Sequence, residues 1–227
     1  MKAEAKPVSF AVGEGTVSGL LLKPPQAESL YVLAHGAGAG MAHPFLSALA
    51  AALAERRIAT LRYQFPYMER GSKRPDSPKV AEAAVAAAVT EAARLAPKLP
   101  LFAGGKSFGG RMTSQAAAHG LLPDVKGLIF VGFPLHPPGA PADTRGDHLT
   151  DVKVPMLFLQ GTRDEFANLA LLKPLVARLG KRATLHLVEG GDHSFKLPAA
   201  LGRKPAEVMA ELADTAAEFI SARVTGG

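Results

Sequence analysis

Short runs of apolar residues alternate along the chain with stretches in which apolar residues recur every three or four positions. The runs predict strands, and the stretches predict helices. The predicted strands cover residues 30–34, 58–63, 101–103, 127–133, 154–160 and 183–188. The predicted helices cover residues 44–56, 80–95, 111–119, 169–179 and 205–223. Strands and helices that alternate in this way are typical of an α/β protein with a mostly parallel sheet and helices on both faces.

A hairpin precedes this alternation. Residues 8–12 and 17–22 are β-rich runs on either side of a Gly-Glu-Gly turn at residues 13–15. Two strands joined by so short a turn pair antiparallel. We therefore expect an antiparallel pair at one edge of the sheet.

Two connections lack a helical or strand pattern. Residues 64–78 are polar and contain proline, and the segment between residues 133 and 154 is rich in Pro, Gly and Asp. The second segment is too short to form a separate lid domain. We therefore expect a single domain over residues 1–227, without a cap.

Residues 105–109 read Gly-Lys-Ser-Phe-Gly, a G-x-S-x-G motif between a predicted strand and a predicted helix. In this context the serine occupies a sharp, strained turn that exposes its hydroxyl. The turn crowds its flanking positions, and Gly105 and Gly109 have no side chain to obstruct it. Ser107 is therefore the predicted nucleophile, and the alternative is a glycine-rich turn with an incidental serine.

The same residues also resemble the end of a phosphate-binding P-loop, G-x-x-x-x-G-K-[ST]. The first glycine of that motif would fall at position 100, which is Pro100. Residues 101–103 form the predicted strand, so no loop remains to surround a phosphate. The spacing therefore excludes a P-loop.

A serine hydroxyl needs a base to take its proton and a carboxylate to orient that base. Asp164 follows the predicted strand 154–160, and His193 follows the strand 183–188 in a glycine-flanked turn. Catalytic groups gather beyond the carboxyl ends of strands in open α/β sheets. Because the chain order Ser107, Asp164, His193 is that of α/β-hydrolases, we predict that these residues form a catalytic triad.

Two other acidic residues compete with Asp164 for the role of orienting acid. Asp192 directly precedes His193, but sequence neighbours point apart, whereas Asp164 would approach from an adjacent strand end. Glu165 is the weaker substitute. A surface turn is the alternative environment for His193. The histidines expected to serve packing or the surface are His119 and His186.

Residues 35–38 read His-Gly-Ala-Gly directly after a predicted strand. An H-G-x-G loop at this place in α/β-hydrolases supplies a backbone N–H to the oxyanion hole. We predict that the Ala37 and Phe108 N–H groups form this hole and stabilise the charge that develops on a carbonyl oxygen. The His35 ring is expected to fix the loop. The residues expected to line the substrate site are His35, Phe65, Tyr67 and His136.

With these motifs in place, the chain resembles small α/β-hydrolases of the dienelactone-hydrolase-like superfamily over nearly its whole length. Residues 62–68, 73–76 and 133–139 further resemble a bacterial branch whose eukaryotic relatives include a chromatin-complex subunit. The resemblance implies an α/β-hydrolase fold without a cap domain. Dienelactone hydrolase itself has a cysteine where Ser107 stands, so its substrate is not carried over.

Composition narrows the chemistry further. The chain has no cysteine, which excludes disulfides, thiolate metal sites and a cysteine nucleophile. The predicted triad implies no metal or organic cofactor. No apolar run approaches the roughly 18 residues of a membrane-spanning helix, and residues 1–10 lack the apolar run of a secretory signal. We therefore expect a soluble cytoplasmic protein with no membrane partner.

The formal net charge of +6 raises the question of a nucleic-acid partner. The basic clusters, however, are small and far apart in the sequence, tryptophan is absent and no aromatic residues are interleaved with them, so no nucleic-acid partner is expected. The clusters are Arg70–Lys73–Arg74, Arg178–Lys181–Arg182 and Arg203–Lys204.

Together the motifs predict a serine hydrolase that transfers an acyl group to water, with a small-molecule carboxylic ester or thioester as substrate. The alternative is a hydrolase-fold scaffold or binding protein with little or no turnover, since chromatin-associated relatives show that the fold can serve as a scaffold. The sequence leaves the oligomeric state open.

Overall fold

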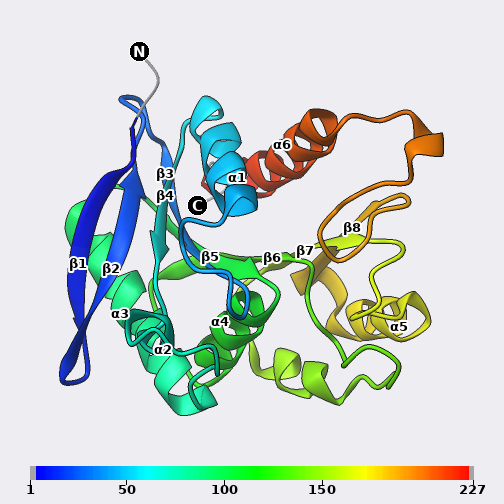
Figure 1. Ribbon diagram of the computed structural model, residues 1–227, viewed down its shortest axis with the longest axis horizontal. Coiled ribbons are helices and arrows are strands. Elements are labelled where there is room, and N and C mark those ends of the chain that lie inside the picture. The colour runs from blue at the N-terminus through cyan, green and yellow to red at the C-terminus, as the bar shows by residue number, and fades with distance from the viewer. Residues whose placement is uncertain (1–3, 225–227) are drawn as a thin grey trace.

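The computed structural model describes residues 4–224 and builds them around an eight-stranded sheet (Figure 1). The strands are β1 (Lys6–Val12), β2 (Gly15–Leu22), β3 (Ser29–Ala34), β4 (Ile58–Tyr63), β5 (Leu101–Lys106), β6 (Val125–Val131), β7 (Met156–Gly161) and β8 (Ala183–Val188). The helices are α1 (Pro44–Glu55), α2 (Pro66–Glu69), α3 (Pro78–Leu95), α4 (Phe108–Ala118), α5 (Leu169–Leu179) and α6 (Pro205–Val224). The 3-10 helices are η1 (Thr144–Asp151), η2 (Gly180–Arg182) and η3 (Ala199–Leu201).

The order of the strands across the sheet is β1-β2-β4-β3-β5-β6-β7-β8. Strand β2 pairs antiparallel with β1 and with β4, and the strands from β4 to β8 are parallel. This confirms the predicted α/β fold with an antiparallel pair at one edge. From β3 the chain runs outward to β4 and then returns to β5, so the winding direction reverses between β3 and β5. Ligands bind at such a switch point in open α/β sheets.

Helices cover both faces of the sheet, as predicted (Figure 1). Helices α1 and α6 pack on one face, and α3, α4 and α5 pack on the other. Every residue of the central strands β3 and β4 is buried. A strand covered on both faces has no solvent side, which explains why these runs lack a polar alternation.

The structure corrects several predicted boundaries. Strand β5 continues to Lys106 and α4 begins at Phe108, whereas the predicted strand ended at residue 103 and the predicted helix began at residue 111. Glycines that look like turn residues belong to the strand because β3 lies so close. A Cβ on Gly105 would lie 2.4 Å from the Ala34 carbonyl oxygen.

The two predicted loops also contain short helices. Helix α2 lies within residues 64–78, and η1 lies between residues 133 and 154. The second connection holds no other helix or strand, so the described part of the chain has no cap domain over the sheet. The prediction of a single domain over residues 1–227 stays a prediction, since residues 1–3 and 225–227 lie outside the described range. No helix within residues 4–224 is long and apolar enough to cross a membrane.

Candidate active site

Ser107 occupies the single-residue turn between β5 and α4, at the switch point of the sheet. Its backbone has φ +50° and ψ −117°, a conformation that side-chain-bearing residues rarely adopt. The Ser107 N–H donates to the Val131 carbonyl of β6, and the Ser107 carbonyl accepts from the Arg111 N–H of α4. The surrounding elements therefore hold the serine in the strained geometry that the motif predicts.

The glycines around this turn permit an unusually close approach of backbones. A Cβ on Gly109 would lie 2.6 Å from the His35 carbonyl oxygen, so the first turn of α4 lies directly against the end of β3. On the other side, a Cβ on Gly36 would lie 3.7 Å from the Ser107 Cβ. The Gly-rich loop after β3 is thereby brought beside the serine.

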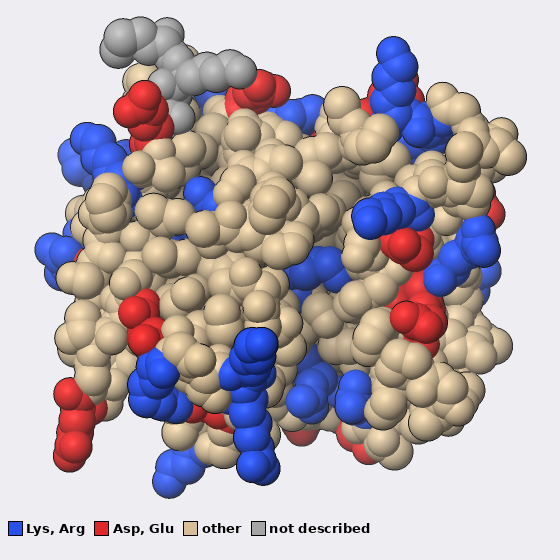
Figure 2. Space-filling view, in the orientation of Figure 1, with Lys and Arg blue, Asp and Glu red and all other residues tan. Residues whose placement is uncertain are grey.

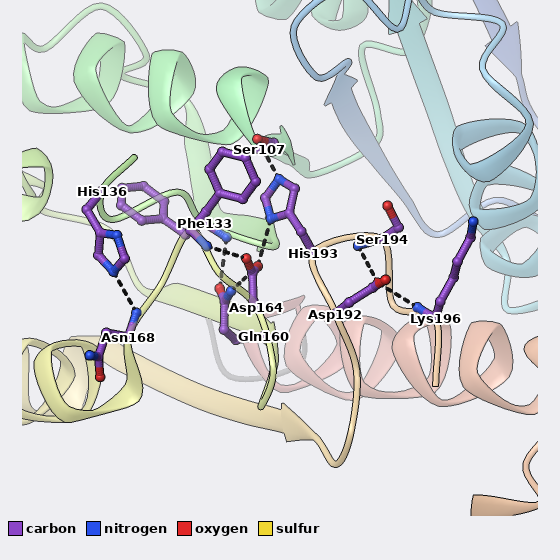
Figure 3. A network of polar contacts seen from close by, with 11 residues as sticks. Ser107, Phe133, His136, Gln160, Asp164, Asn168, Asp192, His193, Ser194 and Lys196 are labelled. Atoms are coloured by element: carbon purple, nitrogen blue, oxygen red, sulfur yellow. Dashed lines mark hydrogen bonds and ion pairs between the residues drawn. The ribbon is translucent and has the colours of Figure 1, made fainter. Parts of the chain in front are cut away.

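The three residues predicted as a triad converge from three strand ends (Figure 3). His193 Nε2 lies 2.9 Å from Ser107 Oγ, and His193 Nδ1 lies 2.7 Å from Asp164 Oδ2. Because a carboxylate accepts hydrogen bonds, the Nδ1 atom carries the imidazole proton and Nε2 is left to accept from the serine hydroxyl. The arrangement is suited to general-base activation of Ser107.

Asp164 is buried, with 5 % of its surface exposed, and both carboxylate oxygens accept hydrogen bonds. Gln160 Nε2 donates to Oδ2 at 2.5 Å, and the Phe166 N–H donates to Oδ1 at 2.8 Å. Gln160 is itself fixed, because its Oε1 accepts from the Phe133 N–H at 2.9 Å. The Phe166 ring packs on the His193 ring at a centroid distance of 4.3 Å. These contacts fix the position of the carboxylate beside His193 Nδ1.

The sequence analysis did not identify Gln160 as a site residue, because it belongs to no motif. The signal was a single amide side chain near the end of an otherwise apolar strand, β7. A buried polar residue in such a place needs hydrogen-bond partners, and here one partner is Asp164.

The two acidic residues that compete with Asp164 for the orienting role make no hydrogen bond to the imidazole. Asp192 Oδ1 accepts from the Ser194 and Lys196 N–H groups at 2.8 and 2.9 Å, so Asp192 closes the turn that carries His193 (Figure 3). Glu165 is exposed, and its side chain makes no hydrogen bond to His193. The structure therefore places Asp164, rather than either competitor, against the imidazole.

The histidines outside this site pair with glutamates. His119 Nδ1 lies 2.7 Å from Glu82 Oε2, and His186 Nε2 lies 2.7 Å from Glu211 Oε1. The surface or packing role expected for both is in keeping with these contacts. Within residues 4–224 no three His, Asp or Glu side chains are grouped so as to hold a metal ion.

The Ala37 and Phe108 N–H groups, predicted as the oxyanion hole, lie on the two segments that meet at Ser107. Among residues 4–224, neither amide donates a hydrogen bond to a backbone carbonyl or a side chain. The next amide of the loop is occupied, because the Gly38 N–H donates to Tyr67 Oη at 2.8 Å. Two free donors beside the predicted nucleophile are in keeping with the predicted oxyanion hole.

The structure corrects the prediction that His35, Phe65 and Tyr67 line the substrate site. His35 and Phe65 have no exposed surface, and Tyr67 has 1 %. His35 Nδ1 lies 2.7 Å from the Gly36 carbonyl oxygen, and Nε2 accepts from the Phe65 N–H at 3.1 Å. Burial lowers the pKa of His35, which favours the neutral ring that this bonding needs. The ring therefore fixes the loop from behind, as expected, but offers no surface to a substrate.

His136 likewise uses its ring for structure. It is 3 % exposed, its Nδ1 lies 2.8 Å from the Pro137 carbonyl oxygen, and its Nε2 accepts from the Asn168 N–H at 2.8 Å (Figure 3). This contact ties the loop after β6 to the start of α5. The prediction that His136 contacts the substrate is therefore wrong for its two ring nitrogens, because each already has a hydrogen-bond partner within the protein.

An open hollow of about 390 Å³ lies beside the imidazole. Its lining is mainly polar and comes from the segments that follow β7 and β8. The lining residues are Arg163, Glu165, Phe166, Asp192, His193 and Ser194. A small acyl or leaving group has room here beside His193.

Known structures share this architecture. A dienelactone hydrolase from Anabaena variabilis superposes with a TM-score of 0.79 at 20 % identity, over 98 % of this chain and 99 % of the other. XC6422 from Xanthomonas campestris, a serine hydrolase without a lid, has a TM-score of 0.72 at 21 % identity, over 92 % of each chain. Est1E from Butyrivibrio proteoclasticus has a TM-score of 0.73 at 18 % identity, over 96 % of this chain and 99 % of the other. At these identities the likeness establishes the fold.

A family model described as an alpha/beta hydrolase domain matches residues 27–221, which includes every residue of the site described above. The match supports a hydrolase as the class of enzyme. The chain therefore belongs to the α/β-hydrolase domain family.

Proposed function

We propose that the protein is a serine hydrolase that transfers an acyl group to water by means of Ser107, His193 and Asp164. The observation that carries this proposal is the continuous chain of contacts from Asp164 Oδ2 through the imidazole to Ser107 Oγ, at 2.7 and 2.9 Å. Each group has the hydrogen-bonding role that nucleophilic catalysis demands of it.

In the first half-reaction, Ser107 Oγ attacks the carbonyl carbon of the substrate while His193 Nε2 takes the hydroxyl proton. The carbonyl oxygen becomes negative and accepts hydrogen bonds from the Ala37 and Phe108 N–H groups, each worth on the order of 3 kcal/mol in the transition state. Asp164 stabilises the imidazolium that forms. His193 then gives the proton to the leaving oxygen or sulfur, and the acyl-enzyme remains.

In the second half-reaction, a water molecule replaces the leaving group. His193 Nε2 takes a proton from the water as its oxygen attacks the acyl carbon, and the same two amides stabilise the second tetrahedral intermediate. The proton returns to Ser107 Oγ when the bond to the serine breaks. The products are a carboxylic acid and the free enzyme.

The substrate class follows from the shape of the site. The hollow beside His193 is small and open, and no cap covers it within residues 4–224. A small carboxylic ester or thioester is therefore the proposed substrate. The likeness to esterases concerns the fold, so the proposal rests on the site and not on those relatives.

The test is hydrolysis of p-nitrophenyl acetate and butyrate by the wild type and by Ser107→Ala. We expect turnover by the wild type and a loss of about 10⁶-fold in kcat for Ser107→Ala if the three residues act as a unit. The thermal unfolding midpoint of the variant serves as a control for folding. Absence of turnover on every ester would favour the scaffold alternative, and full activity of the alanine variant would remove Ser107 as nucleophile.

A further inference from the structure

Lys106, the residue before the proposed nucleophile, buries its charged end. A lysine at a protein surface normally packs its aliphatic stem on apolar groups and keeps its ammonium in water. In Lys106 the order is reversed: the residue retains some exposure, yet its Nζ is inaccessible to water and has no hydrogen-bond partner among residues 4–224. So unfavourable a placement of a charged group calls for a specific reason.

The Nζ atom lies close to Asp164, the proposed orienting acid, and to His193, the proposed base. The position that a Gly132 side chain would occupy is 2.9 Å from Lys106 Nζ, 3.5 Å from Asp164 Oδ2 and 3.5 Å from His193 Cε1. These three groups therefore border one small space, which is open only because residue 132 is glycine. The Nζ atom also lies 5.8 Å from the centre of the Phe195 ring.

The charges around Lys106 come from the ends of β7 and β8. Burial lowers the pKa of Lys106 to about 8, against the opposing effect of the Asp164 and Asp192 carboxylates, which raise it. His193 is the further titratable group on that side, while the loop after β3 presents Gly36 to the lysine stem. Lys106 therefore changes charge within the pH range in which enzymes work, directly beside the imidazole.

We propose that Lys106 is a positioning residue for the reaction, whose buried amino group controls how readily His193 accepts and holds the serine proton. The inference rests on the proposed function, because it concerns the same imidazole. While Lys106 is protonated, its charge opposes the formation of a second positive charge on His193. When Lys106 releases its proton to water, the imidazolium of the transition state forms without a neighbouring cation.

The successive loss of protons by His193 and Lys106 predicts a two-step dependence of kcat/KM on pH. In the wild type, kcat/KM rises in two steps, first as His193 loses its proton and again, by roughly three- to tenfold, as Lys106 loses its proton near pH 8. In Lys106→Met the charge is absent at every pH. We expect the variant to rise in one step, with the midpoint of that step about one pH unit higher than the first midpoint of the wild type.

Lys196→Met is the matched control, because Lys196 is an exposed lysine on the same turn as His193. We expect this variant to keep the two-step profile. A two-step profile in Lys106→Met with unshifted midpoints would overturn the proposal, since a lysine that only fills space would give that result.

A second measurement keeps the inference independent of turnover and of the stability of the variant. The His193 Cε1–H resonance, assigned by its loss in His193→Gln, is followed by NMR against pH in the wild type and in Lys106→Met. We expect a second, smaller inflection near pH 8 in the wild type alone. A single inflection in the wild type would contradict the role of Lys106 even if no ester is hydrolysed. Two inflections without ester hydrolysis would count against the proposed function only.

Discussion

The proposed reactivity of Ser107 depends on hydrogen bonds that begin well inside the protein. Gln160 is fully buried and joins the Phe133 backbone to Asp164, and Asp164 joins Gln160 to His193. An imidazole on a surface turn would otherwise rotate freely. This network leaves its Nε2 aimed at Ser107 Oγ, so the geometry exists before any substrate binds.

Asp164→Asn tests the last link of this network. An asparagine has nearly the same shape but can present an amide N–H to His193, which favours the wrong imidazole tautomer. We expect kcat for a small ester to fall by about 10⁴-fold, with the thermal midpoint changed little. Steady-state kinetics provide the measurement. A variant within tenfold of the wild type would mean that Asp164 does not orient the base.

The residues that the sequence identified are those with a motif or a fixed order along the chain. Ser107, Asp164 and His193 could be predicted because each follows a strand and each has a known chemical partner. The contacts of Gln160 and the proposed role of Lys106 could not, because both depend on which side chains the strand ends bring together in space. His35, Phe65 and Tyr67 were correctly placed near the site, but sequence reasoning cannot tell the exposed face of a loop from its buried side.

At the scale of elements, the approach of α4 to β3 decides where Ser107, the proposed nucleophile, lies. We predict that Gly109→Ala destabilises the protein by about 1–3 kcal/mol, because a Cβ 2.6 Å from the His35 carbonyl oxygen forces the helix away. Displacement of α4 also moves Ser107, so ester hydrolysis should fall as well.

Urea unfolding and ester kinetics measure the two effects of Gly109→Ala. Gly15→Ala is the control, since the nearest atom to its new Cβ is the Val12 carbonyl oxygen at 3.7 Å. Unfolding curves that coincide for Gly109→Ala and the wild type would show that α4 can move away from β3 without a loss of free energy of unfolding.

The contact between α4 and η1 predicts a pH dependence of stability. Ser114 Oγ and His148 Nε2 lie 2.7 Å apart, and burial followed by the charge of Arg111 lowers the pKa of His148 to about 4. The unfolded chain, whose histidine titrates near 6.5, binds more protons than the folded chain between these two values. This group therefore contributes stability above about pH 6.5 that is lost as the pH falls toward 4.

Thermal unfolding of the wild type and His148→Gln at pH 7 and pH 5 tests this effect. We expect the midpoint of the wild type to fall more than that of the variant, by roughly 2–4 °C. Equal falls in the two proteins would show that His148 is not a source of the acid sensitivity.

Element types were predictable from the sequence because the apolar runs and the helical spacing are long. Strand β8 and helix α5 have the predicted bounds. The end of β5 was not predictable, because Gly104 and Gly105 have the composition of a turn and lie in a strand only where a neighbouring backbone comes close. The short helices α2 and η1 lack enough turns to produce a periodic signal.

At the scale of the whole molecule, the lack of a cap within residues 4–224 over the carboxyl ends of the strands limits what the site can bury. Figure 2 shows a hollow near the centre of one face, with Lys and Arg side chains scattered around it and Asp and Glu side chains among them. Without a cap, a long acyl chain would remain largely in water and gain little of the roughly 0.8 kcal/mol available for each buried CH₂ group.

We therefore predict that acetyl and butyryl esters have kcat/KM values equal to or greater than those of a dodecanoyl ester. The p-nitrophenyl series, assayed below the micelle concentration of each ester, provides the comparison, and added detergent below its own micelle concentration checks for aggregation. A steep rise toward dodecanoyl would reveal a lipid-sized pocket that the open hollow does not provide.

Labelling by a fluorophosphonate tests the central claim, that Ser107 is an activated nucleophile. The Ser107 oxygen attacks phosphorus, fluoride leaves, and the adduct remains on the residue that attacked. We predict one adduct per chain, located at Ser107 by peptide mass spectrometry, with labelling abolished in Ser107→Ala and slowed by orders of magnitude in His193→Gln. Absence of an adduct in the folded wild type, or an adduct that persists in Ser107→Ala, would contradict the account.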